Sequence, residues 1–155
     1  MIVWTLKIII IILFYSAGYG QTLDDYIEVK REVIKTEKKA AIAEAMTLTE
    51  EESGPFWELY NEFDFEISKV HNVRIAAIKD LTANYDAMSD DQADELWNQY
   101  LTYQQQLVKL KKNYYKKFKK ILPAAKAVLY FQAENKIAAL INAELAMNLP
   151  LIETK

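Results

Sequence analysis

The side chains of this chain that could perform acid–base or metal chemistry are few and scattered. His71 is the only histidine, and an imidazole can act as a general base or as a metal ligand. The chain has no cysteine, and no serine–histidine–aspartate arrangement accompanies His71. The one glycine after residue 20 also excludes a glycine-rich loop that cradles phosphate. We therefore interpret His71 as a packed, partly buried residue and predict a protein without catalytic residues, cofactor or metal.

Two opposite charges lie on predicted apolar helix faces. Arg74 interrupts an otherwise apolar row, and Glu134 falls on the inward side of the last predicted helix. Because an unpaired buried charge is costly, we expect Arg74 to pair with a carboxylate of another helix, with Glu134 as the first candidate. The alternative is that Arg74 extends its guanidinium group to solvent.

Acidic and basic residues are concentrated in different parts of the chain. From Glu44 to Glu95 there are fourteen carboxylates and three cations, whereas no carboxylate occurs from Leu96 to Ala133. The latter segment holds eight lysines, several of them spaced by three or four residues as on one face of a helix. These lysines are Lys109, Lys111, Lys112, Lys116, Lys117, Lys119, Lys120 and Lys126. The simplest interpretation is a solvated face.

Aromatic residues among these lysines leave a second interpretation open. Cations beside aromatic rings form a surface that can bind acidic and apolar polypeptide, or anionic lipid headgroups. The candidate residues for binding a partner are Tyr114, Tyr115, Lys116, Lys117, Phe118, Lys119 and Lys120.

Few helix breakers and abundant Ala, Leu, Glu, Lys and Gln predict an all-α chain. Four helices are expected, over residues 23–46, 49–88, 89–122 and 123–148. Pro55 would lose an intrahelical bond in a helix that begins at Glu50, so we expect the second helix to be kinked or to begin late, near Ser53. The first helix has a thin apolar face, so residues 21–46 are expected to pack loosely.

The two central helices carry continuous apolar rows. One runs from Phe56 to Leu81, and the other runs from Leu96 to Ile121 and is broadened by Leu101 and Val108. A helix over residues 56–88 would be about 50 Å long, whereas a compact domain of this size has a radius of gyration of about 14 Å. We therefore expect an elongated, bent four-helix fold with two long central helices, whose apolar surface favours a homodimer.

Residues 1–20 have the pattern of a cleavable secretory signal peptide. Lys7 precedes an apolar run, and small residues follow as far as Gly20. An uncleaved anchor is the alternative, although the run is about half of the ~20 residues that span a membrane. We predict export to the periplasm, residues 21–155 as one helical domain, and membrane contact only through an uncleaved leader. Export and the acidic second helix argue against nucleic acid, which the lysines alone would permit.

Two short segments mark helix starts, and Met88-Ser89-Asp90-Asp91-Gln92 repeats the pattern of the first. In the first, Leu48-Thr49-Glu50-Glu51-Glu52, we predict a reciprocal cap in which the Thr49 hydroxyl accepts from the Glu52 N–H and the Glu52 carboxylate accepts from the Thr49 N–H. The second, Leu122-Pro123-Ala124-Ala125-Lys126, places proline where the first turn of a helix tolerates it.

With these motifs, a leader and no cysteine, residues 47–152 resemble the Spy/CpxP family of periplasmic stress proteins, whose motif is LTxxQ, and its metal-resistance relatives. Glu52 stands where the family usually has glutamine, and the second motif, Leu122 to Lys126, is more degenerate. The resemblance implies a long, bent four-helix fold, often dimerised into a cradle that holds unfolded polypeptide without ATP. Relatives restrain an envelope sensor kinase or sense metal, the latter through ligand sets that this chain lacks apart from His71.

These observations predict a chaperone-like binding protein that shields unfolded polypeptide during envelope stress. The alternative is a regulatory partner of an envelope stress or metal-response sensor, and a purely structural envelope protein is a third hypothesis.

Overall fold

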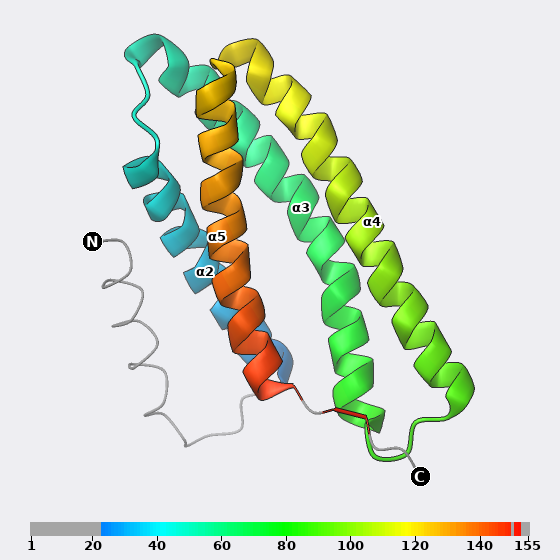
Figure 1. The fold of residues 1–155 in the computed structure, drawn as a ribbon. Helices are drawn as coiled ribbons and strands as arrows, with labels where there is room; N and C mark the ends of the chain where they lie inside the picture. The colour runs from blue at the N-terminus through cyan, green and yellow to red at the C-terminus, as the bar shows by residue number, and fades with distance from the viewer. Residues whose placement is uncertain (1–22, 150, 153–155) are drawn as a thin grey trace. The chain divides into compact units, whose positions relative to one another are not determined.

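The computed structural model describes residues 23–149 and 151–152, and all of their regular structure is helical. The helices are α2 (Leu23–Ala45), α3 (Glu50–Asn84), α4 (Asp90–Ile121) and α5 (Ala124–Asn148) (Figure 1). The predicted all-α, four-helix fold with two long central helices is confirmed. None of the helices in the described part of the chain is long and apolar enough to cross a membrane. The predicted leader, residues 1–20, lies outside the described residues.

The chain divides between Thr47 and Leu48 into two compact units. The first unit contains α2, and the second contains α3, α4 and α5. This boundary lies one residue beyond the segment 21–46, which we expect to pack loosely. The three later helices therefore form a unit with contacts of its own.

α3 begins at Glu50, so the expectation of a late start is wrong. The Thr49 hydroxyl accepts from the Glu52 N–H at 3.3 Å, and the Glu52 carboxylate accepts from the Thr49 N–H at 3.0 Å. Pro55 lies inside the helix. The reciprocal cap orders the first turn ahead of the proline, which removes only one hydrogen-bond donor from the helix.

α3 also ends earlier than predicted, at Asn84 instead of residue 88. The Asn84 side-chain amide donates to the Asp80 carbonyl at 3.0 Å, and the Ala87 N–H donates to the Asn84 carbonyl at 3.1 Å. Such local bonds from an asparagine compete with helix continuation. The chain then turns, and Ser89 and Gln92 form a second reciprocal cap at the start of α4.

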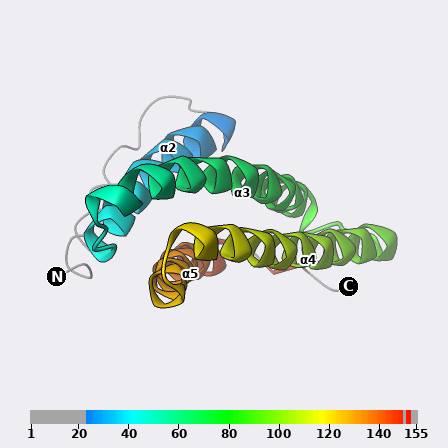
Figure 2. The same cartoon turned by 90° about the horizontal axis from the view of Figure 1, so that it is seen from above.

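α3, α4 and α5 run in alternating directions, and α5 begins after a reversal at Leu122–Pro123 (Figure 1). Figure 2 shows that α3 follows a curved path. At about 1.5 Å per residue, the 35 residues of α3 are roughly 52 Å long. The core of the unit lies near the reversal, so the long helices are not buried evenly.

Aromatic rings from all three helices build this core. Phe118 and Tyr130 have ring centroids 4.5 Å apart, and the Phe56 ring stands perpendicular to that of Tyr130 at 5.4 Å. Edge-to-face contacts of this kind add to the free energy gained from burial. The group, here called the ring core, consists of Phe56, Tyr60, Phe63, Tyr114, Phe118, Tyr130 and Phe131.

The core thins toward the α3–α4 turn. Ala77 and Tyr103 are buried there, whereas Leu96 and Leu107 are only half-buried. Leu101 and Val108, which we expect to broaden the packed row of α4, are instead exposed. The apolar stripe of α4 is wider than the surface that its neighbours within this unit cover.

Candidate functional site

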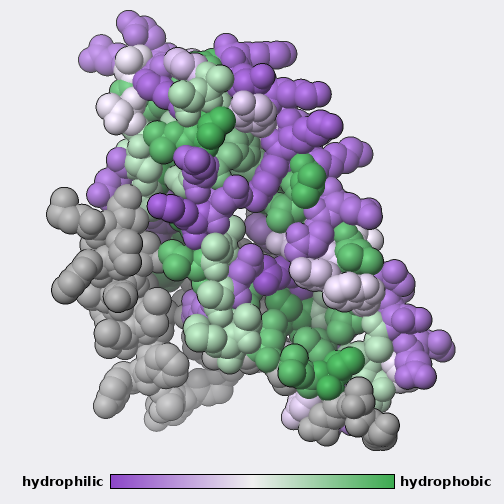
Figure 3. Space-filling model, in the orientation of Figure 1, coloured by the Kyte–Doolittle hydropathy of each residue, from purple (hydrophilic) through white to green (hydrophobic). Residues whose placement is uncertain are grey.

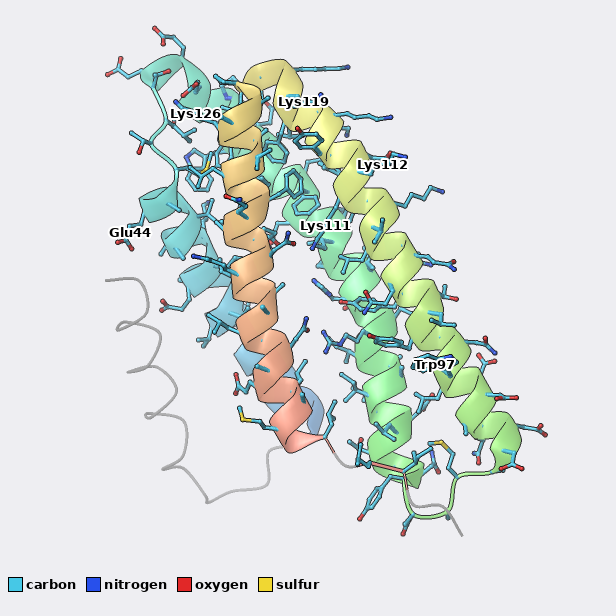
Figure 4. All side chains as sticks on the ribbon, in the orientation of Figure 1. Glu44, Trp97, Lys111, Lys112, Lys119 and Lys126 are labelled. Carbon is cyan, nitrogen blue, oxygen red and sulfur yellow. The ribbon has the colours of Figure 1, made fainter. Side chains whose placement is uncertain are left out.

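The two helix-start motifs meet in the structure. The Lys126 Nζ lies 2.5 Å from Glu52 Oε2, and Figure 4 shows Lys126 near the start of α5. This hydrogen bond, followed by that from the Thr49 backbone, lowers the pKa of the Glu52 carboxyl. Leu122 is buried, and Pro123 directly precedes the first residue of α5. The motifs thus connect the starts of α3 and α5, which is a structural role.

The predicted partner-binding cluster, residues 114–120, divides between core and surface. Tyr114 and Phe118 are buried in the ring core, and Tyr115 is half-buried with its ring 6.0 Å from that of Phe131. The buried rings of Tyr114 and Phe118 are unavailable to a partner. The cluster therefore keeps its lysines and part of Tyr115 as an exposed surface.

Glu62 of α3 organises part of that cluster, and sequence reasoning missed it. Lys117 Nζ lies 2.6 Å from Glu62 Oε1, and the Tyr114 hydroxyl donates to the same oxygen at 2.9 Å. Lys117 first, and then Tyr114, lowers the pKa of the Glu62 carboxyl. Glu62 is one of many carboxylates in α3, and nothing in the sequence distinguished it as the one that contacts Lys117 and Tyr114.

Three exposed lysines of α4, here called the lysine row, have no opposite charge paired with them in the described part of the chain. Lys109, Lys116 and Lys120 are spaced by seven and four residues and therefore share one side of the helix. None of the three has a hydrogen bond, ion pair or ring contact within the described part of the chain. Figure 3 shows hydrophilic side chains along the α4 edge with hydrophobic ones between them.

A second exposed side of α4 carries apolar residues. Trp97, Leu101 and Val108 are 60%, 41% and 64% exposed, and Trp97 stacks on Tyr100 at 5.3 Å. Acidic residues precede them and lysines follow them at helical spacing, and Figure 4 shows Lys112 and Lys119 pointing away from the helices. This side, here called the tryptophan row, consists of Asp90, Asp94, Trp97, Leu101, Val108, Lys112, Tyr115 and Lys119.

α5 also leaves an apolar side exposed. Leu129, Leu140 and Met147 are 39%, 53% and 79% exposed. Together with Ala133, Lys136 and Ala143 they are spaced by four and three residues, and this group is here called the leucine row. A helix that is apolar on several sides is normally buried on several sides. The exposed leucine row is therefore a surface that sequence reasoning missed.

The inward side of α5 agrees with the predicted position of Glu134. Glu134 is buried, as are Ala127 and Tyr130, whereas Val128 is 42% exposed. Contacts of Tyr130 with the ring core fix the rotation of the helix, because a helix apolar on all sides has no strong preference of its own.

Arg74 and His71 meet at Tyr103. The Arg74 guanidinium lies 5.7 Å from the centre of the Tyr103 ring, and His71 Nδ1 lies 3.2 Å from the Tyr103 hydroxyl oxygen. Arg74 Nη1 donates to Asn142 Oδ1 at 2.5 Å. Glu134 is eight residues, or about 12 Å of helix, before Asn142. The structure therefore joins Arg74 to an amide of α5 and not to the expected Glu134.

An open groove of about 330 Å³ lies where α3 turns into α4. Its lining residues are Asp80, Asn84, Met88, Asp91, Gln92, Glu95, Leu96 and Gln99. No group of three histidine, cysteine or carboxylate side chains in the described part of the chain is arranged to hold a metal ion.

No protein-family model, curated protein or solved structure matches this chain. The fold defines an all-α, four-helix protein, and the exposed rows of α4 and α5 are the surfaces on which a function can be argued.

Proposed function

We propose that this chain is an exported, non-enzymatic protein that shields partly unfolded polypeptide in the periplasm without ATP, as expected from its resemblance to the Spy/CpxP family. The observation that carries the proposal is the exposed leucine row of α5. Unfolded polypeptides expose apolar side chains. When these side chains contact the apolar leucine row, the client surface and the row are both removed from water, which is favourable.

The dimensions of the leucine row suit a short extended segment. Leu129 and Met147 are eighteen residues apart, which corresponds to about 27 Å of helix. An extended chain rises about 3.4 Å per residue, so roughly eight residues of a client would cover the row. Full burial of one leucine or methionine side chain is worth about 1.5–3 kcal/mol. Partial burial of three such residues supports weak, reversible binding.

The lysine row of α4 supports the choice of client. Lys109, Lys116 and Lys120 have no carboxylate neighbour in their own segment of sequence. Uncompensated cations attract acidic segments from a distance, and salt screens this attraction. Clients that combine apolar and acidic residues should therefore bind best, and more weakly at high salt.

The proposal is tested by the light scattering of a heated or reduced client protein. We expect the wild-type chain to suppress aggregation near a one-to-one ratio, and the Leu140→Gln/Met147→Gln variant to lose most of this effect. Ala139→Gln/Ala146→Gln changes two exposed residues of the same helix with the same spacing, so this control should retain the activity.

Absence of suppression by the wild-type chain would overturn the proposal, as would equal activity of the two double variants. A pull-down from the envelope that recovers one high-affinity partner, together with little suppression, would favour the regulatory alternative instead.

A further inference from the structure

We propose that the C-terminal part of α4 binds the surface of an anionic phospholipid bilayer. The contact surface, here called the lysine face, is the lysine row together with Lys112 and Lys119. The leucine row of α5, which carries the proposed function, is not part of this contact, so neither proposal rests on the other. The sequence-based prediction confines membrane contact to an uncleaved leader, and the lysine face is a second place for such contact.

The lysines of this face are concentrated on a short part of one helix surface. At about 100° per residue, their directions fall within an arc of roughly 100° around the helix axis. From Lys109 to Lys120 the face is about 16 Å long. All of its side chains are exposed, and Figure 4 shows Lys112 and Lys119 pointing away from α3 and α5. The lysine face is therefore an outer edge of the three-helix unit.

The positive charge of the lysine face is not balanced locally. No ion pair within the described residues involves any of its lysines. The last carboxylate of α4 is Glu95, which precedes Lys109 by fourteen residues, or about 21 Å of helix. This distance is more than twice the screening length of about 8 Å at physiological salt. An anionic surface near these lysines is therefore attracted with little repulsion from the same helix.

Apolar and aromatic side chains border the lysine face. Val108 is 64% exposed, and Tyr115 is half-buried, with Lys119 Nζ 5.1 Å from the centre of its ring. Both residues lie about 20–40° beyond one edge of the lysine arc. At a bilayer surface, such residues and the lysine stems enter the headgroup region, while the ammonium groups stay at the phosphates. The surface thus offers both kinds of contact that a peripheral helix makes.

The width of the lysine face favours a bilayer over an acidic polypeptide. An arc of about 100° on a helix 10–12 Å in diameter is roughly 10 Å wide. One extended chain occupies only about 4.8 Å of that width, whereas a layer of headgroups contacts all of it. Groups of four to eight cations on amphipathic helices bind anionic membranes. The number and spread of these lysines are therefore suited to a layer of phosphates.

The order of charges along α4 also predicts its orientation at the bilayer. An anionic surface repels the exposed carboxylates at the start of the helix, which are Asp90, Asp91, Asp94 and Glu95. The helix should therefore be tilted, with its end against the headgroups and its start directed away. The reversal at Leu122–Pro123 would then lie closer to the bilayer than the α3–α4 turn.

Flotation of the full chain with lipid vesicles tests the proposal. We expect stronger binding to vesicles of equal parts phosphatidylglycerol and phosphatidylcholine than to phosphatidylcholine alone, and a smaller difference as salt is raised. A retained leader would bind both kinds of vesicle, so the measured quantity is the ratio between them. Lys112→Gln/Lys116→Gln should lower this ratio at least about tenfold.

The matched control is Lys35→Gln/Lys39→Gln, which removes two exposed lysines at the same spacing from α2. This variant should bind like the wild-type chain, and circular dichroism should show unchanged helicity in both variants. Equal binding of the wild-type chain to the two kinds of vesicle, or an equal loss in the two variants, would overturn the proposal. Binding of soluble polyglutamate without binding of the anionic vesicles would also overturn it and assign the lysine face to acidic polypeptide.

A fluorescent label tests the orientation, because the chain has no native cysteine. An environment-sensitive dye on Val108→Cys should brighten and shift to shorter wavelength when the anionic vesicles are added. The same dye on Asn98→Cys, an exposed position near the acidic start of α4, should respond much less. A response at Asn98 that equals or exceeds that at Val108 would contradict the tilted contact that the charges of α4 require.

Discussion

Tyr130 sits at the centre of the ring core and carries a polar atom into it. The side chain is fully buried, and its ring contacts Phe56 and Phe118. Within the described residues, its hydroxyl has no hydrogen-bond partner. A buried polar group without a partner loses its hydrogen bonds to water and gains none in the protein, at a cost of roughly 1–3 kcal/mol. The ring of Tyr130 therefore stabilises the unit, whereas its hydroxyl opposes this.

Removal of that hydroxyl should not destabilise the protein. We expect Tyr130→Phe to leave the free energy of unfolding at pH 7 unchanged or to raise it by up to about 2 kcal/mol. Phe118→Ala, which deletes a neighbouring ring, should lower it by about 3–5 kcal/mol. Urea unfolding followed by circular dichroism measures both. A loss of more than about 1 kcal/mol in Tyr130→Phe would mean that the hydroxyl makes a stabilising hydrogen bond.

The same tyrosine should make the protein sensitive to alkali. Burial, and then the negative charge of Glu134, raises the pKa of the Tyr130 hydroxyl. Because the folded protein holds the Tyr130 proton more tightly than the unfolded chain does, the neutral hydroxyl contributes fully to the free energy of unfolding below the ordinary tyrosine pKa of about 10. This contribution is lost as the pH rises above that value. The loss is about 1.4 kcal/mol per pH unit for one such group.

Unfolding measured between pH 9 and pH 12 checks this sign. Stability of the wild-type chain should fall more steeply above about pH 10 than that of Tyr130→Phe. Burial also raises the pKa of Tyr60, so the variant should keep part of the alkaline loss. Identical slopes for the two proteins would contradict the assignment.

Side chains of the ring core were predictable where the spacing was strong. Phe56, Tyr60 and Phe63 repeat at steps of four and three, and all three are buried as expected. The contacts of Glu62 with Tyr114 and Lys117 were not predictable, because they depend on the register between α3 and α4. Nothing in a single helix determines that register.

At the scale of the elements, two reciprocal caps order the starts of α3 and α4. Thr49 and Glu52 bond each other's backbone N–H groups, and Ser89 and Gln92 do the same. Gln92 demonstrates that an amide can take the place of the Glu52 carboxylate in such a cap. The charge of Glu52 therefore matters mainly for its contact with Lys126.

Variants of the α3 cap should separate these two roles. We expect Thr49→Ala to lower the free energy of unfolding by about 1 kcal/mol at any pH between 4 and 8. Glu52→Gln should keep the cap and lose the ion pair, giving a smaller loss at pH 7. The lowered pKa of Glu52 means that this ion-pair contribution is present above the ordinary carboxyl pKa and disappears as the pH falls through the lowered value.

Urea unfolding of the wild-type chain and Glu52→Gln at pH 7 and at pH 3 provides the measurement, with Ser89→Ala as a matched cap variant on α4. The difference between wild type and Glu52→Gln should shrink at the lower pH. A constant difference would show that the charge of Glu52 does not act through Lys126.

The existence and type of the helices could be predicted from the sequence, and some of their limits and faces could not. Capping residues signalled the starts at Glu50 and Asp90. The end at Asn84 depends on local side-chain bonds that compete with the helix. The inward position of Glu134 on α5 was predicted, but the exposed leucine row was missed, because apolar residues lie on several sides of this helix and only tertiary contacts choose the packed one.

At the scale of the whole molecule, α3, α4 and α5 form one buried aromatic core and two exposed apolar rows, which lie on different sides of the helices. The ring core holds the helices together, and the tryptophan row of α4 is an exposed side with an apolar middle, aspartates at its start and lysines at its end. The leucine row of α5 is the side we assign to unfolded polypeptide. Sequence reasoning placed the partner-binding surface at residues 114–120, where Tyr114 and Phe118 belong to the core and Tyr115 is half-buried. A pattern of rings and lysines does not distinguish these cases, because rotation of the helix decides which rings are accessible.

The central claim is that the leucine row holds many different unfolded polypeptides. The most direct measurement places a photo-crosslinking amino acid at Leu140 of the full chain in living cells under envelope stress, and at neighbouring Ala139 as the matched exposed control. We predict that Leu140 gives adducts with many proteins of different mass and that Ala139 gives few. Absence of adducts at Leu140, equal adducts at both positions, or a single partner at Leu140 would contradict the account.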